Sequence, residues 1–365
     1  MENIIIQISK YVLIILFAIY TFYCFRAFAV KNKNRQNRIF HGQRTIIFLI
    51  HLLLTTLLFM NSKDTTILIM GALQMVFYLV CVKLYQLFYK GLSKLILNNM
   101  MMCMMIGFIM LERLAMDQIV KQFIMAAAAA GICLFVPLFI QKFTFWERLG
   151  WQYALVGILL LLLVFVVGRE KYGAANWVEF GGIGFQPSEF VKIIYVFFIA
   201  AVLAKSRSFK EIVLITFVAG IHVVILVLEK DLGAALIFFV TYIMMLYIGT
   251  AKLSYLLAGF GAGTAAAVGA YYVFSHVRVR VLAWRDPWSV IDAEGYQIAQ
   301  SLFAMGNGGW DGTGLNKGLP ESIPVVESDF VFAAIVEELG AIFAVCLILI
   351  YLSSYIMFVN IALKM

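Results

Sequence analysis

Three carboxylates stand where an apolar stretch of this chain meets a polar segment. Asp329 lies between Ser328 and Phe330, and Glu337 and Glu338 follow inside the apolar stretch that begins there. Ionisable side chains at membrane depth are costly unless they pair or take part in chemistry. A carboxylate at the mouth of such a stretch can act as a general base for an attacking hydroxyl. The alternative is that Asp329 and Ser328 cap the next helix.

The segment before Asp329, about residues 276–330, is rich in glycine and polar side chains. Arg278 and Arg280 open it, and a guanidinium can hold a phosphate through two hydrogen bonds. Anchoring at the membrane surface is the alternative role for these arginines. The amides and hydroxyl that follow are Gln297, Gln300 and Ser301.

Two smaller polar clusters precede this segment. Gln186, Glu189 and Lys192 surround the Pro187 that opens an apolar stretch, and Lys192, three residues after Glu189, can pair with it or reach a phosphate. Trp177 lies just before this cluster. Asp231 opens the apolar stretch 231–250. It is expected either to cap that helix or, as a buried carboxylate, to pair with an Arg or Lys.

The composition decides which elements must position these residues. Hydrophobic residues make up 64% of the 365 and charged residues only 13%, and the mean hydropathy is +0.96. These values exclude a water-soluble domain and predict a polytopic membrane protein whose spans are all helices. A helix needs roughly 20 apolar residues to cross a bilayer. About eleven transmembrane helices are expected, near residues 5–25, 45–62, 66–89, 96–112, 119–140, 150–168, 188–204, 211–228, 231–250, 253–275 and 330–355.

Charged residues in the short loops predict the orientation. The loop after the first span carries six Lys or Arg and no acid, and Lys205, Arg207 and Lys210 lie together in a later loop. Both loops are expected on the cytoplasmic side. The N-terminus is then outside, the C-terminus is cytoplasmic, and the 276–330 segment faces the exterior. Because the net charge of +8 comes from these loops, no nucleic-acid partner is expected.

One carboxylate base together with several cations fits the transfer of a group from a phosphate leaving group to a hydroxyl. Such a leaving group needs cations rather than a strong acid, and the attacking hydroxyl needs one carboxylate base. Glycoside hydrolysis differs, because there a second carboxyl group protonates the leaving alkoxide. The cysteines are scattered through apolar stretches and predict no metal site.

The polar clusters together resemble the SEDS family, whose members include FtsW, RodA and SpoVE. The resemblance covers about residues 96–355. It rests on Gly173-Ala174 with Trp177, Gln186-Pro187-Ser188-Glu189 with Lys192, Asp231-Leu232-Gly233, Gly295-Tyr296-Gln297 with Gln300-Ser301, the glycines at 306, 308 and 309, and Ser328-Asp329-Phe330 with Glu337-Glu338-Leu339-Gly340.

The resemblance implies an inverting peptidoglycan glycosyltransferase that polymerises lipid II on the outer face of the bacterial cytoplasmic membrane. It also implies a role in division, elongation or sporulation and a class B penicillin-binding protein as partner. Asp329 matches the proposed catalytic aspartate, and Glu337, Glu338 and Trp177 are expected to support the site. A divalent cation, Mg²⁺ or Mn²⁺, is a further expectation at the diphosphate. The implied substrate-binding residues are Arg278, Arg280, Lys192, Glu189, Gln186, Gln297, Gln300, Ser301 and Asp231.

The chain departs from the family pattern in three ways. Glu327, Val325 and Asn176 stand where His, Glu and Arg are common. Residues 1–92 are interpreted as three additional transmembrane helices. Residues 93–365 are interpreted as the SEDS-like core, without the last two family helices.

Other functions compatible with the sequence are a transporter of lipid-linked precursors, a non-catalytic scaffold that binds a penicillin-binding protein, and an oligosaccharide ligase. A transporter should show repeated halves and broken helices at mid-membrane, and no internal repeat is visible. An oligosaccharide ligase is not expected to combine the Gln186–Glu189 motif with Asp329-Phe330.

Overall fold

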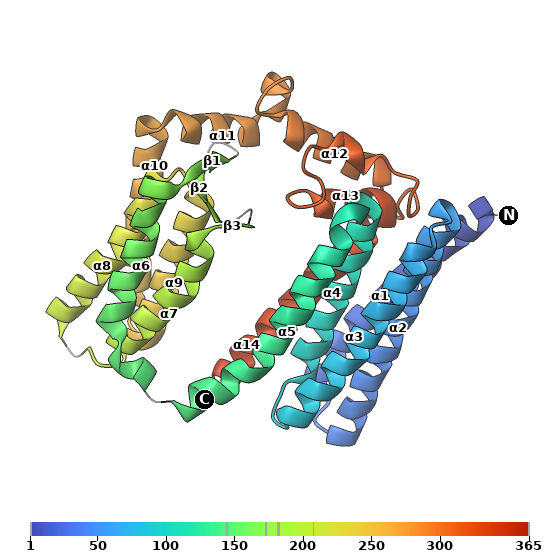
Figure 1. The fold of residues 1–365 in the computed structure, drawn as a ribbon, viewed down its shortest axis with the longest axis horizontal. Coiled ribbons are helices and arrows are strands. Elements are labelled where there is room, and N and C mark those ends of the chain that lie inside the picture. Colours follow the sequence, from blue (N-terminus) through green and yellow to red (C-terminus); the bar gives the residue numbers. More distant parts are fainter. Residues whose placement is uncertain (1, 144, 172–173, 181–182, 207, 364–365) are drawn as a thin grey trace. The chain divides into compact units, whose positions relative to one another are not determined.

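The fold is a set of long helices that form two compact units (Figure 1). A computed structural model describes residues 2–143, 145–171, 174–180, 183–206 and 208–363. The first unit consists of Met1–Phe135 and Val279–Met365, and the second of Val136–Arg278. Residues near the two ends of the sequence therefore share one core.

The first unit is built on long helices from both ends of the chain. Counted over both units, ten helices in the described residues are long and apolar enough to cross a membrane. In this unit, helices are α1 (Glu2–Ala29), α2 (Lys33–Ser62), α3 (Thr65–Phe88), α4 (Lys94–Leu114), the first part of α5 (Ile119–Lys142), α12 (Tyr296–Gly308), α13 (Val331–Leu339) and α14 (Ala341–Ala362), with short 3₁₀ turns η1 (Met116–Gln118), η3 (Pro287–Val290) and η4 (Pro320–Ser322).

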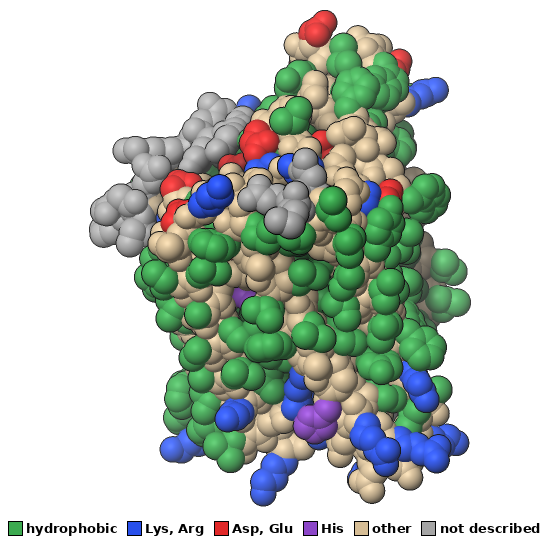
Figure 2. All heavy atoms as spheres, turned by 90° about the vertical axis from the view of Figure 1, so that its right-hand side faces the viewer, with side chains coloured by type: hydrophobic (Ala, Val, Ile, Leu, Met, Phe, Trp, Pro, Cys, Tyr) green, Lys and Arg blue, Asp and Glu red, His purple; other side chains and the backbone are tan. Residues whose placement is uncertain are grey.

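Side chains on the outside of these helices are largely apolar, as lipid contact requires. Figure 2 shows hydrophobic side chains along the helices, with Lys and Arg side chains gathered at the lower end. The helix starts have ordinary caps, because Asn32, Asp64 and Ser93 accept hydrogen bonds from backbone N–H groups in the first turns of α2, α3 and α4. Composition and capping thus both favour these helices locally.

Polar side chains buried between the helices fix how those helices pack. Asn99 on α4 accepts a hydrogen bond from the Tyr20 hydroxyl on α1 at 2.9 Å and donates to the Ser353 hydroxyl on α14 at 2.9 Å. On α3, Gln74 donates to Glu112 of α4 at 2.7 Å. Helices α1 and α3 thus belong to the same core as α4 and α14. The domain boundary near residue 92 stays a prediction.

The second unit combines helices with a small antiparallel sheet. Its elements are η2 (Phe145–Arg148), α6 (Gly150–Val167), β1 (Arg169–Lys171), β2 (Ala174–Phe180), β3 (Ile183–Phe185), α7 (Pro187–Leu203), α8 (Phe209–Leu228), α9 (Leu232–Thr250) and α10 (Leu253–Val273). The strands are ordered β1-β2-β3, with Trp177 opposite Arg169 and Val178 opposite Phe185. Helix α11 (Ser275–Arg285) crosses the boundary between the units.

Three features differ from the sequence-based expectations. The count of eleven spans is not confirmed. Among the described residues, ten helices are long and apolar enough to cross a membrane, and α7, with 17 residues, is not one of them. The predicted span 330–355 is two helices, because Gly340 adopts a φ of +91° and ends α13. The strands were not expected, since runs of three to seven mixed residues carry little periodicity. The all-helical polytopic class itself is correct.

Replacing Asn99 with Leu is expected to lower the free energy of unfolding by about 1–3 kcal/mol, because the buried Tyr20 and Ser353 hydroxyls lose a partner. Thermal and denaturant unfolding of the purified protein measures this. The control Asn34→Ala, at an exposed position, should change the stability by less than about 0.5 kcal/mol. Equal effects of the two substitutions would contradict a role for Asn99 in packing.

Candidate functional site

Asp329 lies in a tight turn just before α13. Its backbone N–H donates to the carbonyl of Val325 at 3.1 Å, and Ser328 N–H donates to the same carbonyl at 3.3 Å. Val325 has a φ of 58°, an unfavourable conformation for a β-branched residue, so the turn is held by its surroundings. The Asp329 side chain is exposed.

The capping role considered for Asp329 does not occur. Helix α13 has Phe330 at its N-cap position, and no side chain accepts a hydrogen bond there. Within the described residues, the Asp329 carboxylate makes no hydrogen bond or ion pair to the protein. The Ser328 hydroxyl donates to Val325 O at 3.4 Å. Asp329 therefore presents a carboxylate that is available to a ligand.

Glu337 is buried and holds the loop that precedes Asp329. It is 3% exposed. Its Oε1 accepts hydrogen bonds from Asn307 Nδ2 and from the backbone N–H of Leu319, each at 3.1 Å. Its backbone carbonyl accepts hydrogen bonds from the N–H and hydroxyl of Thr313 at 2.9 and 3.0 Å. Glu337 thus secures α12 and residues 313–319 against α13.

Glu338 is fully buried and pairs with a cation from α4. Arg113 donates to its Oε1 through Nε at 3.0 Å and Nη2 at 2.9 Å. The other carboxylate oxygen, Oε2, accepts the backbone N–H of Asn316 at 3.1 Å. Arg113 Nη1 also pairs with Glu321 on η4. One guanidinium therefore holds both ends of the stretch 321–338, which contains Asp329.

Helix α1 supplies a second anchor for the loop. Lys10 forms an ion pair with Asp311 at 2.7 Å and donates to Gly312 O at 3.2 Å. The Tyr11 hydroxyl also donates to Asp311, at 3.1 Å. The hydrogen bond from Lys10 lowers the pKa of Asp311. The loop lies so close to α13 that a Cβ on Gly312 would be 2.4 Å from Glu338 O.

The other predicted residues of the first unit lie on α11 and α12. Arg280 and Gln297 are exposed, and Gln300 is half-buried. The Ser301 hydroxyl is directed to its own helix, where it donates to Ile298 O at 2.8 Å. The roles of these four residues in substrate binding stay predictions.

Two polar pairs lie in the second unit. Gln186 donates to Asp231 Oδ2 at 2.7 Å, and Asp231 Oδ1 accepts the backbone N–H of Ala234 at 3.0 Å. Lys192 and Glu189 form an ion pair at 2.6 Å. Asp231 is therefore a helix cap and also joins α9 to the residue before α7. The capping role expected for Asp231 is thus present, and its alternative role as the partner of a cation stays a prediction.

The remaining predicted residues of this unit are Arg278 and Trp177. Arg278 is exposed on α11, and Trp177 is half-buried on β2. Trp177 has a contact of its own within the protein. Their roles at a substrate site stay predictions.

Glu229 is a buried carboxyl group that the sequence analysis did not single out. It is 2% exposed, and among the described residues neither of its carboxylate oxygens has a hydrogen-bond partner. Burial, together with the charge of Asp231, raises the pKa of Glu229 from 4.5 to about 7. The position ends α8, so its sequence context resembles an ordinary loop residue.

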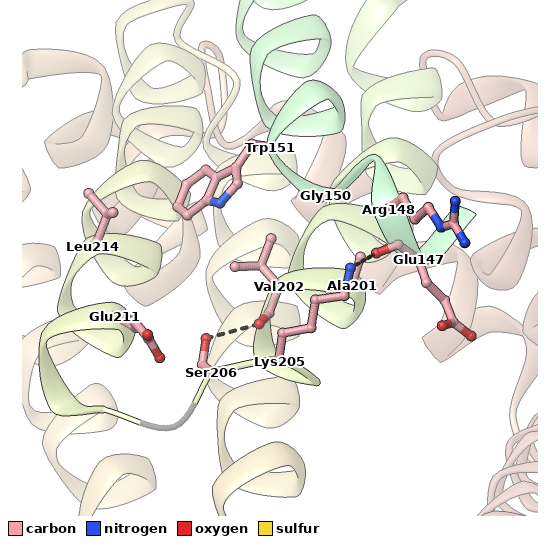
Figure 3. Close-up of a pocket in the computed structure, with 10 residues that line it drawn as sticks. All are labelled: Glu147, Arg148, Gly150, Trp151, Ala201, Val202, Lys205, Ser206, Glu211 and Leu214. Carbon is pink, nitrogen blue, oxygen red and sulfur yellow. Dashed lines mark hydrogen bonds between the residues drawn. The ribbon is translucent and has the colours of Figure 1, made fainter. Parts of the chain in front are cut away.

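A cavity of about 210 Å³ in the second unit contains none of the predicted residues. Figure 3 shows Arg148 and Lys205 there, with Lys205 donating to the Glu147 carbonyl. Glu147 and Glu211 also line it, so cations and carboxylates occur together. This balance of charge gives the cavity no preference for an anion.

The glutamate pair does not fit a divalent cation. Both oxygens of Glu338 already accept hydrogen bonds from Arg113 and Asn316. No group of three or more His, Cys, Asp or Glu side chains in the described ranges is arranged to hold a metal ion. A cation at the diphosphate therefore stays a prediction, and Glu337 and Glu338 are not proposed as its ligands.

Residues 93–365, three quarters of the chain, match the family model for FtsW, RodA and SpoVE, described as cell cycle proteins. The chain belongs to the FtsW/RodA/SpoVE family. Peptidoglycan glycosyltransferase RodA of Mycobacterium leprae is 36% identical over 220 residues, which are 56% of this chain and 47% of that protein. The chain thus spans about half the length of the curated RodA relatives that it matches.

Two further similarities extend this membership. The probable peptidoglycan glycosyltransferase FtsW of Pseudoalteromonas translucida is 30% identical over 281 residues, or 72% of this chain and 69% of that protein. A solved structure described as "Structural coordination of polymerization and crosslinking by a peptidoglycan synthase complex" is 26% identical, with a TM-score of 0.52, over 67% of this chain and 70% of that one. This FtsW/RodA/SpoVE protein is accordingly a multi-pass membrane protein.

Arg113 and Lys10 are the supporting residues that sequence reasoning missed. Arg113 follows Glu112 at the end of an apolar stretch, where an ionisable pair is itself unusual. Lys10 lies in the first apolar stretch, where a single basic residue near the N-terminus indicates no particular partner. Their partners are distant in the sequence: Glu321 lies 208 residues after Arg113, and Gly312 lies 302 residues after Lys10. Nothing in the spacing indicates these contacts.

Replacing Arg113 with Gln is expected to lower the free energy of unfolding by about 3–5 kcal/mol, because Glu338 then stays buried without its cation. Glu321→Gln removes only the exposed half of the network and should cost less than about 1 kcal/mol. Denaturant unfolding in detergent measures both values. The double variant Arg113→Gln/Glu338→Gln should recover part of the loss, and an additive loss would contradict the pairing.

The Glu229 carboxyl group predicts a pH dependence of stability. Because its pKa is raised in the folded state, the wild-type protein should lose stability as the pH rises from about 4.5 through about 7. Glu229→Gln should remove this loss, which amounts to at most about 3 kcal/mol. Thermal unfolding between pH 5 and pH 8, roughly the range of greatest stability for many proteins, measures it. The exposed Glu147→Gln serves as control, and parallel profiles for all three proteins would disprove the assignment.

Proposed function

We propose that this protein is a peptidoglycan glycosyltransferase that polymerises lipid II on the outer face of the bacterial cytoplasmic membrane. The observation that carries the proposal is the state of the carboxylates in residues 311–338. Of the six carboxylates there, those of Asp311, Glu321, Glu337 and Glu338 are bound to protein cations or hydrogen-bond donors. Within the described residues, the carboxylates of Glu327 and Asp329 make no such contact, and of these two Asp329 is exposed whereas Glu327 is half-buried. Family membership supplies the reaction class.

The reaction requires one base and stabilisation of a leaving diphosphate. Asp329 accepts the proton of an acceptor sugar hydroxyl while that oxygen attacks the anomeric carbon of the donor. The bond from this carbon to the lipid diphosphate breaks, and the diphosphate leaves with the electron pair. A single displacement of this kind inverts the anomeric configuration. Since the diphosphate remains ionised, it needs no carboxylic acid as proton donor.

The cations proposed to stabilise the diphosphate are Arg278, Arg280 and Lys192. The two arginines are exposed, and the Lys192 side chain is 29% exposed. A guanidinium offers two parallel hydrogen bonds to a phosphate, whereas an ammonium acts as a point charge. Arg→Lys substitutions should therefore weaken binding of the donor. Mg²⁺ or Mn²⁺ would supply further charge at the diphosphate.

The proposed partner is a class B penicillin-binding protein, which would cross-link the strands that this protein makes. Support comes from the similarity to a chain of a peptidoglycan synthase complex described by polymerisation and crosslinking. The proposed orientation places the N-terminus outside and the C-terminus in the cytoplasm, following the basic loops.

Asp329→Asn is expected to lower polymerisation by at least about 10²-fold, since general base catalysis contributes that much or more. The assay resolves glycan strands on gels after incubation of fluorescent lipid II with the purified chain and a class B penicillin-binding protein. Asp292→Asn is the matched control, because it removes an exposed carboxylate from the same 276–330 segment. It should leave the ladder unchanged.

The outcomes separate the reaction from the residue. A ladder from Asp329→Asn equal to that of the wild type would remove Asp329 from the mechanism. The absence of a ladder from every folded variant, the wild type included, would contradict the polymerase function itself.

A further inference from the structure

The connection between α1 and α2 forms a basic pocket that the proposed reaction does not use. This cavity has a volume of about 540 Å³. We define the basic pocket by Tyr23, Arg26, Lys31, Arg35 and Arg38, which line it together with smaller residues. All four cationic side chains are exposed, and Tyr23 is half-buried. The pocket lies at the end of the unit where Lys and Arg side chains gather in Figure 2.

No carboxylate balances the cations of this pocket. The lining contains no Asp or Glu. Residues 26–44, all within the described part of the chain, include six Lys or Arg and no acid. Within the described residues, none of the four pocket cations takes part in an ion pair, and Arg26 lies over the Phe22 ring at 5.8 Å. The cavity of Figure 3 differs, since Glu147 and Glu211 accompany its cations.

The helix geometry increases the cost of this cluster. The first turn of α2 contains no acidic residue, and Lys33 and Arg35 lie there, at the positive end of the helix dipole. Helix α8 shows the usual arrangement, with Glu211 in its first turn completing a capping box with Ser208. Like charges gathered at the wrong helix end are a local conflict, and such conflicts are expected where a ligand resolves them.

The position of the pocket indicates the source of the anion. Helices α1 and α2 are both long and apolar enough to span a membrane, which favours a position at the membrane surface for the connection between them. The tendency of cytoplasmic loops to carry Lys and Arg explains why this loop is basic. That tendency concerns how many basic residues a loop carries and not how their side chains are arranged. It does not require a cavity whose walls present four cations at once. Basic pockets between transmembrane helices are known to suit lipid phosphates.

We propose that the basic pocket binds an anionic phospholipid whose headgroup carries two phosphates. Two phosphates match four cations in charge more closely than one does, and each guanidinium can bind a phosphate through two hydrogen bonds. The volume accommodates a headgroup larger than a single phosphate. The lipid would bind at the membrane surface that the sequence predicts to be cytoplasmic, and its binding does not depend on the glycosyltransferase activity.

The test measures lipid binding by the full chain with native mass spectrometry and thermal unfolding in detergent. The added lipids are phosphatidylcholine, phosphatidylglycerol and diphosphatidylglycerol, the last two at equal total charge. The protein should retain diphosphatidylglycerol most strongly. Arg35→Gln/Arg38→Gln should weaken its binding about thirtyfold, from the usual contribution of each cation near an anionic headgroup.

The matched control is Arg148→Gln/Lys205→Gln, which removes two cations from the charge-balanced cavity of the second unit. It should bind diphosphatidylglycerol as the wild type does. Since all four substituted side chains are exposed, both variants should fold, and unfolding in phosphatidylcholine verifies this. Equal weakening in both variants, or none in either, would overturn the proposal.

A further arm distinguishes a lipid from a free anion. Inorganic pyrophosphate is added to the lipid-free protein and then challenged with diphosphatidylglycerol. Displacement of pyrophosphate by the lipid supports the proposal. Tight pyrophosphate binding that the lipid does not displace, or preference for phosphatidylglycerol at equal charge, would show a different occupant and overturn it.

Discussion

The ion pair between Arg113 and the buried Glu338 is the interaction on which the candidate site depends. A buried carboxylate is unfavourable without a cation, so separating the two residues would destabilise the first unit. The same guanidinium reaches Glu321, and this second contact closes a stretch of chain around Asp329. A charge pair that serves stability thereby also fixes where the proposed base lies. The position of Asp329 is consequently set by α4, a helix more than 200 residues earlier in the sequence.

Asp329 differs in its task from the four acidic side chains that hold residues 311–338 in place. Those four bind other parts of the protein, although they are of the same residue types. Glu337 and Glu338 accept hydrogen bonds from the loop backbone, which has little regular structure to satisfy its N–H groups. Asp311 binds Lys10 at the other side of the loop. These carboxylates accept the hydrogen bonds and ion pairs of the surrounding chain, and in the described part of the structure the Asp329 carboxylate has none. A base that already had an ion pair would be a weaker proton acceptor, since the pair stabilises its charged form.

The sequence predicted the parts of this molecule that local pattern controls. Apolar length predicted the long helices, whereas the site that the polar residues around Asp329 indicate stays a prediction. It could not predict that Asp329 does not cap helix α13, because a capping aspartate and an aspartate that caps nothing can have the same local sequence. Nor could it predict Arg113, whose importance lies in contacts between distant segments. Gly340 shows the same limit, since an apolar stretch continues through it while a positive φ divides the helix. Tertiary contacts decide each of these cases.

Helices α1 to α3 lie outside the segment that matches the family, yet they share its core. Tyr20 bonds to Asn99, and Gln74 bonds to Glu112, so polar contacts join both α1 and α3 to α4 in the apolar interior. Such contacts specify packing more than they add stability, because apolar surfaces alone tolerate several arrangements in lipid. Lys10 extends the connection from α1 to the loop of the candidate site. The support of that loop is therefore divided between α4, inside the family segment, and α1, outside it, and a change in the packing of either helix reaches the turn that holds the proposed base.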